Sequence, residues 1–79
     1  MKTVNKFGTI NEVLERFPDI NYVVVWRHND EIGFSEFVAA RAYDETDGTW
    51  GSGSYFHSLV SAMDYIKDIY ERKFGEEAE

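Results

Sequence analysis

The chain has 79 residues, no cysteine and a net charge of −7 at pH 7, with 15 acidic against 8 basic residues. This length holds one domain, and the missing cysteines exclude disulfides, thiolate metal sites and a cysteine nucleophile. The negative charge argues against direct binding to nucleic acid or to an anionic membrane, because both would repel the chain.

The first segment with a regular apolar pattern predicts a short helix over residues 9–17. Thr9 and Glu12 have the spacing of a capping box at its start, and Pro18 ends it because the residue before a proline avoids helical angles. The apolar stripe of this expected helix consists of Ile10, Val13, Leu14 and Phe17.

Three strands are expected next, separated by two short turns. The run of β-branched and aromatic residues at 22–26 predicts the first strand, and residues 34–43 and 49–56 predict the other two. The turns fall at residues 28–33 and 44–48, and Gly33 in the first of them is available for a positive φ angle. Glycines within the third strand indicate a bulge or a close backbone approach.

The last element is a helix of about 16 residues, which starts after Ser58 as its N-cap. Gly75 has the position of a C′ residue, and Arg72 and Lys73 stand in the last turn, where the helix dipole favours cations. We expect residues 76–79 to be a frayed acidic tail. The apolar face is formed by Leu59, Ala62, Met63, Ile66, Ile69, Tyr70 and Phe74.

Together these elements predict an α+β fold with the order α-β-β-β-α. The simplest architecture is a three-stranded antiparallel meander with both helices packed on one face. We expect one domain over residues 1–79. The chain has no apolar run long enough to span a bilayer and no recognisable signal peptide, so we expect it in the cytoplasm.

The negative charge is concentrated in the C-terminal half, since residues 1–43 carry a net charge of −1 and residues 44–79 a net charge of −6. On the expected second helix, three acids lie within about 60° of one another and opposite the apolar stripe. They form either an ordinary solvated face or an acidic ridge that binds a basic partner, and the turn acids could extend such a ridge. The helix acids are Asp64, Asp68 and Glu71, and the turn acids are Asp44, Glu45 and Asp47.

Aromatic residues make up 16% of the chain, which is more than one layer of a small core needs. Some of them are therefore expected to face outward, where tryptophan and tyrosine commonly anchor interfaces. The alternative is that they are only half-buried. The candidates for partner binding are Trp26, Trp50 and Tyr55.

His28 and His57 each follow the end of an expected strand, and these two strands run in the same direction. Both side chains could therefore lie at one edge of the sheet and form a metal site or an acid–base pair. No third ligand, nucleophile elbow or phosphate-binding glycine pattern accompanies them. We predict no catalytic residue, no metal and no cofactor, and keep a small metal-binding or ligand-binding enzyme as an alternative.

In its size, acidity and element order the chain resembles the small acidic anti-CRISPR proteins of phages. The resemblance implies an inhibitor that occupies the nucleic-acid-binding surface of a nuclease. The sequence thus favours a non-enzymatic interaction protein that binds a basic partner, with charge speeding encounter and buried aromatics holding the complex. The alternatives are an antitoxin-like protein and a homodimeric structural protein.

Overall fold

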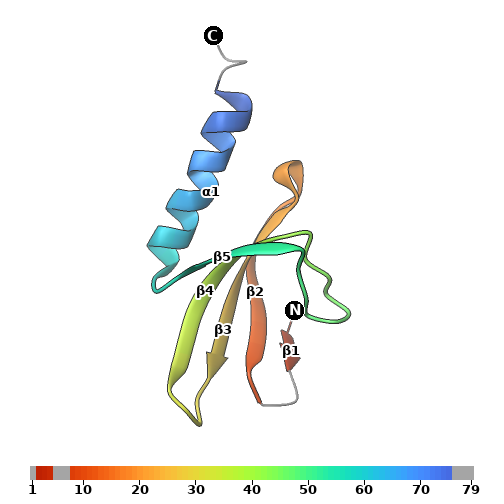
Figure 1. Cartoon of the computed structure of the whole chain (residues 1–79), viewed down its shortest axis with the longest axis vertical. Helices are drawn as coiled ribbons and strands as arrows, with labels where there is room; N and C mark the ends of the chain where they lie inside the picture. The colour runs from red at the N-terminus through yellow and green to blue at the C-terminus, as the bar shows by residue number, and fades with distance from the viewer. Residues whose placement is uncertain (1, 5–7, 76–79) are drawn as a thin grey trace.

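The computed structural model describes residues 2–4 and 8–75 and places them in one antiparallel sheet with an α-helix packed on it (Figure 1). The five strands of this described part lie in the sheet in the order in which they occur along the chain. The predicted α+β class is therefore confirmed. The elements are β1 (Lys2–Val4), β2 (Ile10–Phe17), the 3-10 helix η1 (Pro18–Ile20), β3 (Tyr22–Asn29), β4 (Phe34–Arg41), β5 (Ser52–Phe56) and α1 (Leu59–Phe74).

The predicted first helix is wrong, and with it the α-β-β-β-α order and the layer of two helices. Residues 10–17 form β2, which pairs with β1 on one side and β3 on the other. The two residues of the expected capping box instead interact with residues of β3. The Thr9 hydroxyl accepts a hydrogen bond from Asn29 Nδ2 at 3.5 Å, and Glu12 Oε2 lies 3.3 Å from His28 Nε2.

A β-bulge explains why β2 resembles a helix in its sequence pattern. The register of β2 against β3 shifts between Val13 and Glu15, so Leu14 is the extra residue. In a regular strand Ile10 and Phe17 would face opposite sides of the sheet, because they are an odd number of residues apart. The bulge returns both side chains to one side, and the resulting spacing of seven is also the spacing of two helical turns.

The predicted strands are real, although their ends differ from the expected ones, and β1 was not predicted. The first predicted strand extends to Asn29, and the third is shorter than expected because it begins at Ser52. Gly33 adopts the positive φ that its position suggested, +65°, and Gly48 in the second turn has a φ of +68°. β1 has three residues, which is too few for an alternating pattern to be visible in the sequence.

The sheet has two covered faces, which we call the helix face and the loop face. On the helix face, α1 and the β2–β3 turn pack over Val24 and Ala39. On the loop face, the β4–β5 connection brings Tyr43 and Trp50 over Val25 and Val38. Two helices packed on one face, as predicted, would leave the other face of the sheet open, but here a connection between strands covers that second face.

The second predicted helix is confirmed as α1, and so is its N-cap. Ser58 Oγ accepts a hydrogen bond from the backbone N–H of Ser61 at 3.2 Å. Gly75 is not a left-handed C′ residue, since its φ is −61° and its N–H donates to the carbonyl of Glu71. The expected tail at 76–79 lies outside the described residues.

α1 starts next to the end of β5 and runs to the turn between β2 and β3. Near its C-terminal end, Tyr70 packs edge-on against Phe17 with ring centroids 6.0 Å apart. Lys73 Nζ donates a hydrogen bond to the carbonyl of Asp19 at 3.1 Å. The helix therefore occupies the end of the molecule away from the β3–β4 hairpin, as Figure 1 shows.

Candidate interaction surface

The three predicted acids of α1 all lie on its solvent side. Ala62 and Ile66 are buried against the sheet, and Asp64, Asp68 and Glu71 are exposed on the opposite side. The sequence prediction placed these acids correctly because a 3.6-residue period fixes the side of the helix on which each residue lies. Together they form the surface that we call the acidic ridge.

Basic residues of the same helix accompany the acidic ridge. Arg72 Nη2 lies 3.0 Å from Asp68 Oδ2, and Lys67 Nζ lies 4.0 Å from Glu71 Oε1. Both pairs have i,i+4 spacing on an exposed surface, where such pairs contribute little to stability and exchange readily with solvent. Asp64 has no ion pair within the described part of the chain, which makes it the least compensated acid of the ridge.

The acidic β4–β5 turn does not join the acidic ridge, because it lies on the loop face and α1 lies on the helix face. Asp44 Oδ1 accepts hydrogen bonds from the backbone N–H groups of Thr46, at 2.8 Å, and Asp47, at 3.4 Å. Glu45 forms an ion pair with Arg16 of β2. Asp44 and Glu45 therefore have contacts that hold the turn and fasten it to the sheet, and Asp47 presents an exposed side chain.

Trp26 lies on the helix face, in the part of the sheet nearer the β3–β4 hairpin. Its ring stacks on His28 with centroids 3.8 Å apart and lies parallel to Phe37 at 6.4 Å. Its Nε1 donates a hydrogen bond to Ser35 Oγ at 2.9 Å. The ring is half-buried and packs against both His28 and Phe37, so it behaves as a fixed part of the surface rather than as a free anchor.

Trp50 and Tyr55 lie on the opposite side of the sheet from Trp26. Trp50 packs over Gly53, and its ring also has the guanidinium of Arg27 at 5.6 Å, within cation–π distance. Tyr55 lies beside Trp50 with ring centroids 6.3 Å apart and is 53% exposed. Of the three predicted aromatic anchors, Tyr55 is thus the one that the structure leaves most available to a partner.

The two histidines differ in their surroundings. His28 is buried, with Nε2 close to Glu12, whereas its Nδ1 has no hydrogen-bond partner among the described residues and lies 3.9 Å from Asp30 Oδ1. His57 is exposed in the turn between β5 and α1. Within residues 2–4 and 8–75, no three His, Asp or Glu side chains gather as a metal-binding group.

Two tyrosines interact where α1 packs on the sheet, Tyr65 from α1 and Tyr22 from β3. Hydrogen bonds from Ser54 and then from Tyr22 lower the pKa of Tyr65. Burial raises the pKa of Tyr22, and its hydrogen bond with Tyr65 adds to this increase. The pair joins the first strand residue of β3 to the middle of α1, and its rings are arranged edge to face.

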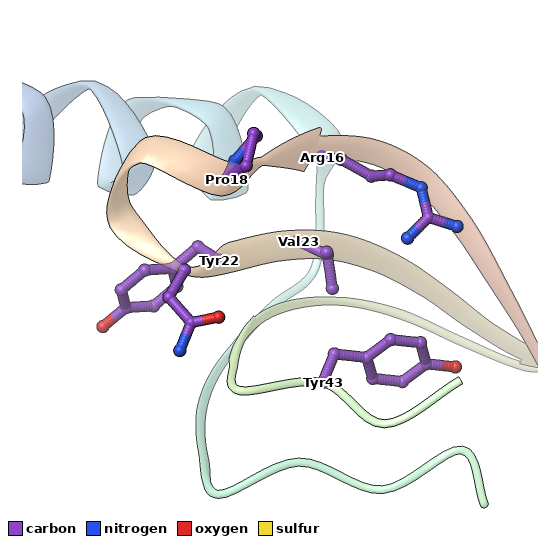
Figure 2. Close-up of a pocket in the computed structure, with 6 residues that line it drawn as sticks. Arg16, Pro18, Tyr22, Val23 and Tyr43 are labelled. Atoms are coloured by element: carbon purple, nitrogen blue, oxygen red, sulfur yellow. The ribbon is translucent and has the colours of Figure 1, made fainter. Parts of the chain in front are cut away.

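A pocket of about 240 Å³ lies where the β4–β5 connection meets the β2–β3 turn (Figure 2). Tyr43 and Val23 form one side of it, and Arg16 points in from the neighbouring strand. Arg16 is already paired with Glu45, so its charge is largely compensated. The pocket combines an apolar wall with one neutralised cation and offers no nucleophile or acid–base pair. Its lining is Arg16, Pro18, Asn21, Tyr22, Val23 and Tyr43.

Leu59 and Met63 were predicted to lie on the apolar face of the helix that packs on the sheet. Both are exposed, as is their neighbour Val60. A signal for this was present: no Asp, Glu, Lys or Arg occurs between Asp47 and Asp64. An uncharged stretch of this length in so acidic a chain marks a surface from which charge is excluded. Within the described residues, half of the exposed large apolar side chains fall in this stretch.

Comparison with protein families, with curated proteins and with solved structures found no match for this chain. None of the helices in the described segments is both long and apolar enough to cross a membrane. What the chain binds must therefore be inferred from its own surface.

Proposed function

We propose that this chain is a non-enzymatic interaction protein that binds a basic surface of a partner protein. In its most specific form, the partner is a nucleic-acid-binding enzyme such as a CRISPR effector, and binding inhibits the enzyme by occupying its groove. The observation that carries the proposal is the acidic ridge. Asp64, Asp68 and Glu71 are exposed on a helix whose other side is fixed to the sheet.

The ridge suits such a groove in its geometry. Asp64 and Asp68 are four residues apart, so their Cα atoms are separated by about 6 Å along the helix axis. A groove lined with Lys and Arg that accommodates the closely spaced phosphates of a nucleic acid can also accept carboxylates at this spacing. A rigid helix presents these carboxylates without the entropic cost of ordering a loop.

The charge of the whole chain supports the proposal. A net charge of −7 attracts a basic partner over several ångströms and increases the association rate, especially at low salt. Arg72 and Lys67 do not prevent this, because exposed pairs of this spacing are weak and the acids can exchange their partners.

The test is a pull-down from nuclease-treated bacterial lysate at low and high salt, followed by measurement of affinity for the protein that is captured. We expect a basic nucleic-acid-binding protein that binds at low salt and is displaced by DNA. Asp64→Lys combined with Asp68→Lys should weaken the affinity about tenfold or more and slow association.

The matched control is Glu31→Lys combined with Asp47→Lys, which changes the net charge equally at exposed positions away from α1. This control should retain most of the affinity. Equal loss in both double variants would show that only total charge matters, and the acidic-ridge proposal would then be wrong. Absence of any captured partner that DNA displaces would overturn the proposed function itself.

A further inference from the structure

The outer edge of β5 is unpaired in the described sheet. β5 is the last strand of the sheet, so its N–H and C=O groups on the side away from β4 have no neighbouring strand. The edge at the other end of the sheet belongs to β1, which is described over only three residues. Short edge strands are one of the means by which proteins avoid pairing with other chains.

β5 lacks the usual protection of an edge strand. Natural edges carry lysine or another charge, a proline, or a bulge that turns the edge away. β5 has the sequence Ser-Gly-Ser-Tyr-Phe and pairs with β4 in unbroken register from Ser52 to Phe56. An uncharged and regular edge in a chain with 29% charged residues indicates a place where another strand is accommodated.

We propose that a second copy of this chain pairs with β5 in antiparallel orientation and joins the two sheets into one. The two-fold axis passes through Ser54, so that Ser54 of each copy faces Ser54 of the other. In this register Tyr55 of one copy faces Gly53 of the other, and Ser52 faces Phe56. This assembly goes beyond the proposed function and stands independently of it.

The Gly53–Tyr55 pair explains why the occupant is a second copy. Both residues lie on the loop face, and Tyr55 is more than half exposed. Gly53 has no side chain, and the ring of Trp50 packs directly above it. Across the axis, each Tyr55 ring would lie beside the Trp50 ring that covers the other copy's Gly53, so the two aromatic rings would pack against each other.

Charge also favours this edge over other contacts between copies. Two chains with a net charge of −7 repel each other, and the repulsion is weakest where the approaching surfaces carry no charge. The stretch between Asp47 and Asp64 contains β5 and both of its ends. The edge that is geometrically free is therefore also the edge at which two copies repel each other least.

The chain's lack of cysteine makes a direct test of the register practical. In the proposed dimer the two Cα atoms of position 54 lie about 5 Å apart, within the range that a disulfide bridges. We expect Ser54→Cys to form a disulfide-linked dimer in oxidised glutathione. The matched control is Ser52→Cys, a change of the same type on the same strand. In the proposed dimer the two cysteines at position 52 would be four residues out of register, or about 14 Å apart, and should not form a disulfide.

Light scattering of the unmodified chain at several concentrations completes the test. We expect the mass of a dimer, and we expect Tyr55→Lys to shift the mass toward that of a monomer. Ile32→Lys, which also places a charge at an exposed apolar position, should leave the dimer intact. A monomer mass at all concentrations would overturn the proposal, and equal crosslinking of Ser54→Cys and Ser52→Cys would overturn the register.

Discussion

Trp26 and His28 stack almost face to face on the helix face of the sheet, with ring centroids 3.8 Å apart and planes inclined by 23°. The imidazole is also held by Glu12, whose carboxylate lies 3.3 Å from Nε2. The imidazole is therefore held both by the face of the indole and by the carboxylate of Glu12. The stack places the Trp26 ring in direct contact with a second ring, on which its emission depends.

The fluorescence of Trp26 should change when His28 is replaced, because the imidazole lies in direct contact with the indole. The measurement uses a Trp50→Phe background, so that Trp26 alone reports. Adding His28→Gln to that background should alter the Trp26 emission, whereas adding His57→Gln, which replaces the exposed histidine, should leave it unchanged. Equal spectra in the two variants would show that the stack does not exist in solution.

Tyr65 of α1 and Tyr22 of β3 should titrate in sequence, with Tyr65 losing its proton first. The hydrogen bond from Ser54 lowers the pKa of Tyr65, and burial raises the pKa of Tyr22. Phenolate absorbance against pH measures both, and Ser54→Ala should raise the pKa of Tyr65. An unchanged titration of Tyr65 in that variant would contradict the role of the Ser54 hydroxyl.

The same shifts determine how stability changes at alkaline pH. The pKa of Tyr65 is lower in the folded chain than in the unfolded chain. Its contribution to stability is therefore present above the unfolded pKa of about 10 and is lost as the pH falls through the folded pKa. The pKa of Tyr22 is higher in the folded chain than in the unfolded chain. Its contribution to stability is therefore present below the unfolded pKa of about 10 and is lost as the pH rises through the folded pKa. Ser54→Ala, which removes the largest cause of the lowered Tyr65 pKa, should therefore reduce the stability more above this pH than below it, as urea titrations on both sides of this pH would show.

Ile66 holds α1 to the sheet and is only 2% exposed. Ile66→Ala should lower the free energy of unfolding by about 2–5 kcal/mol, since it removes buried methyl groups and leaves a cavity. Urea denaturation followed by circular dichroism measures the change. Val60→Ala is the control on the same helix, because Val60 is 70% exposed and its loss should cost less than about 0.5 kcal/mol.

Gly53 allows the β4–β5 connection to lie against the sheet. A Cβ at this position would come within 2.7 Å of Trp50 Nε1 and 3.1 Å of Val38 Cγ1. Gly53→Ala should displace the Trp50 ring and destabilise the fold by about 1–3 kcal/mol. Gly51→Ala should have a smaller effect, because its Cβ would meet its nearest neighbours at an ordinary 3.7 Å. Equal effects in both variants, measured by urea denaturation, would show that Trp50 does not rest on Gly53.

The features of α1, which depend only on the regular period of a helix, were predicted best from the sequence. α1 has the expected N-cap at Ser58, and its acids have the expected exposure, because both follow from local geometry. β2 could not be predicted in this way. Its bulge after Val13 changes which side of the sheet later residues face, and a bulge arises from pairing with β3 rather than from local propensity.

The arrangement of the candidate surfaces depended on long-range geometry in the same way. Whether Asp47 lies near Asp64 depends on the sheet face that the β4–β5 connection covers. That face is set by the packing of Tyr43 and Trp50 on Val25 and Val38. The exposure of Val60 likewise depends on where α1 crosses the sheet, and this position cannot be predicted from the spacing of the apolar residues.

The strand order bears on how the chain acquires its structure. Each strand pairs with the strand that comes just before it, so every pairing closes a short loop. Chains with such local pairing reach the folded state faster than sheets built from distant segments. During synthesis, hairpins can add one at a time from the N-terminal end as the ribosome releases them, and only α1 must wait until its docking surface is complete.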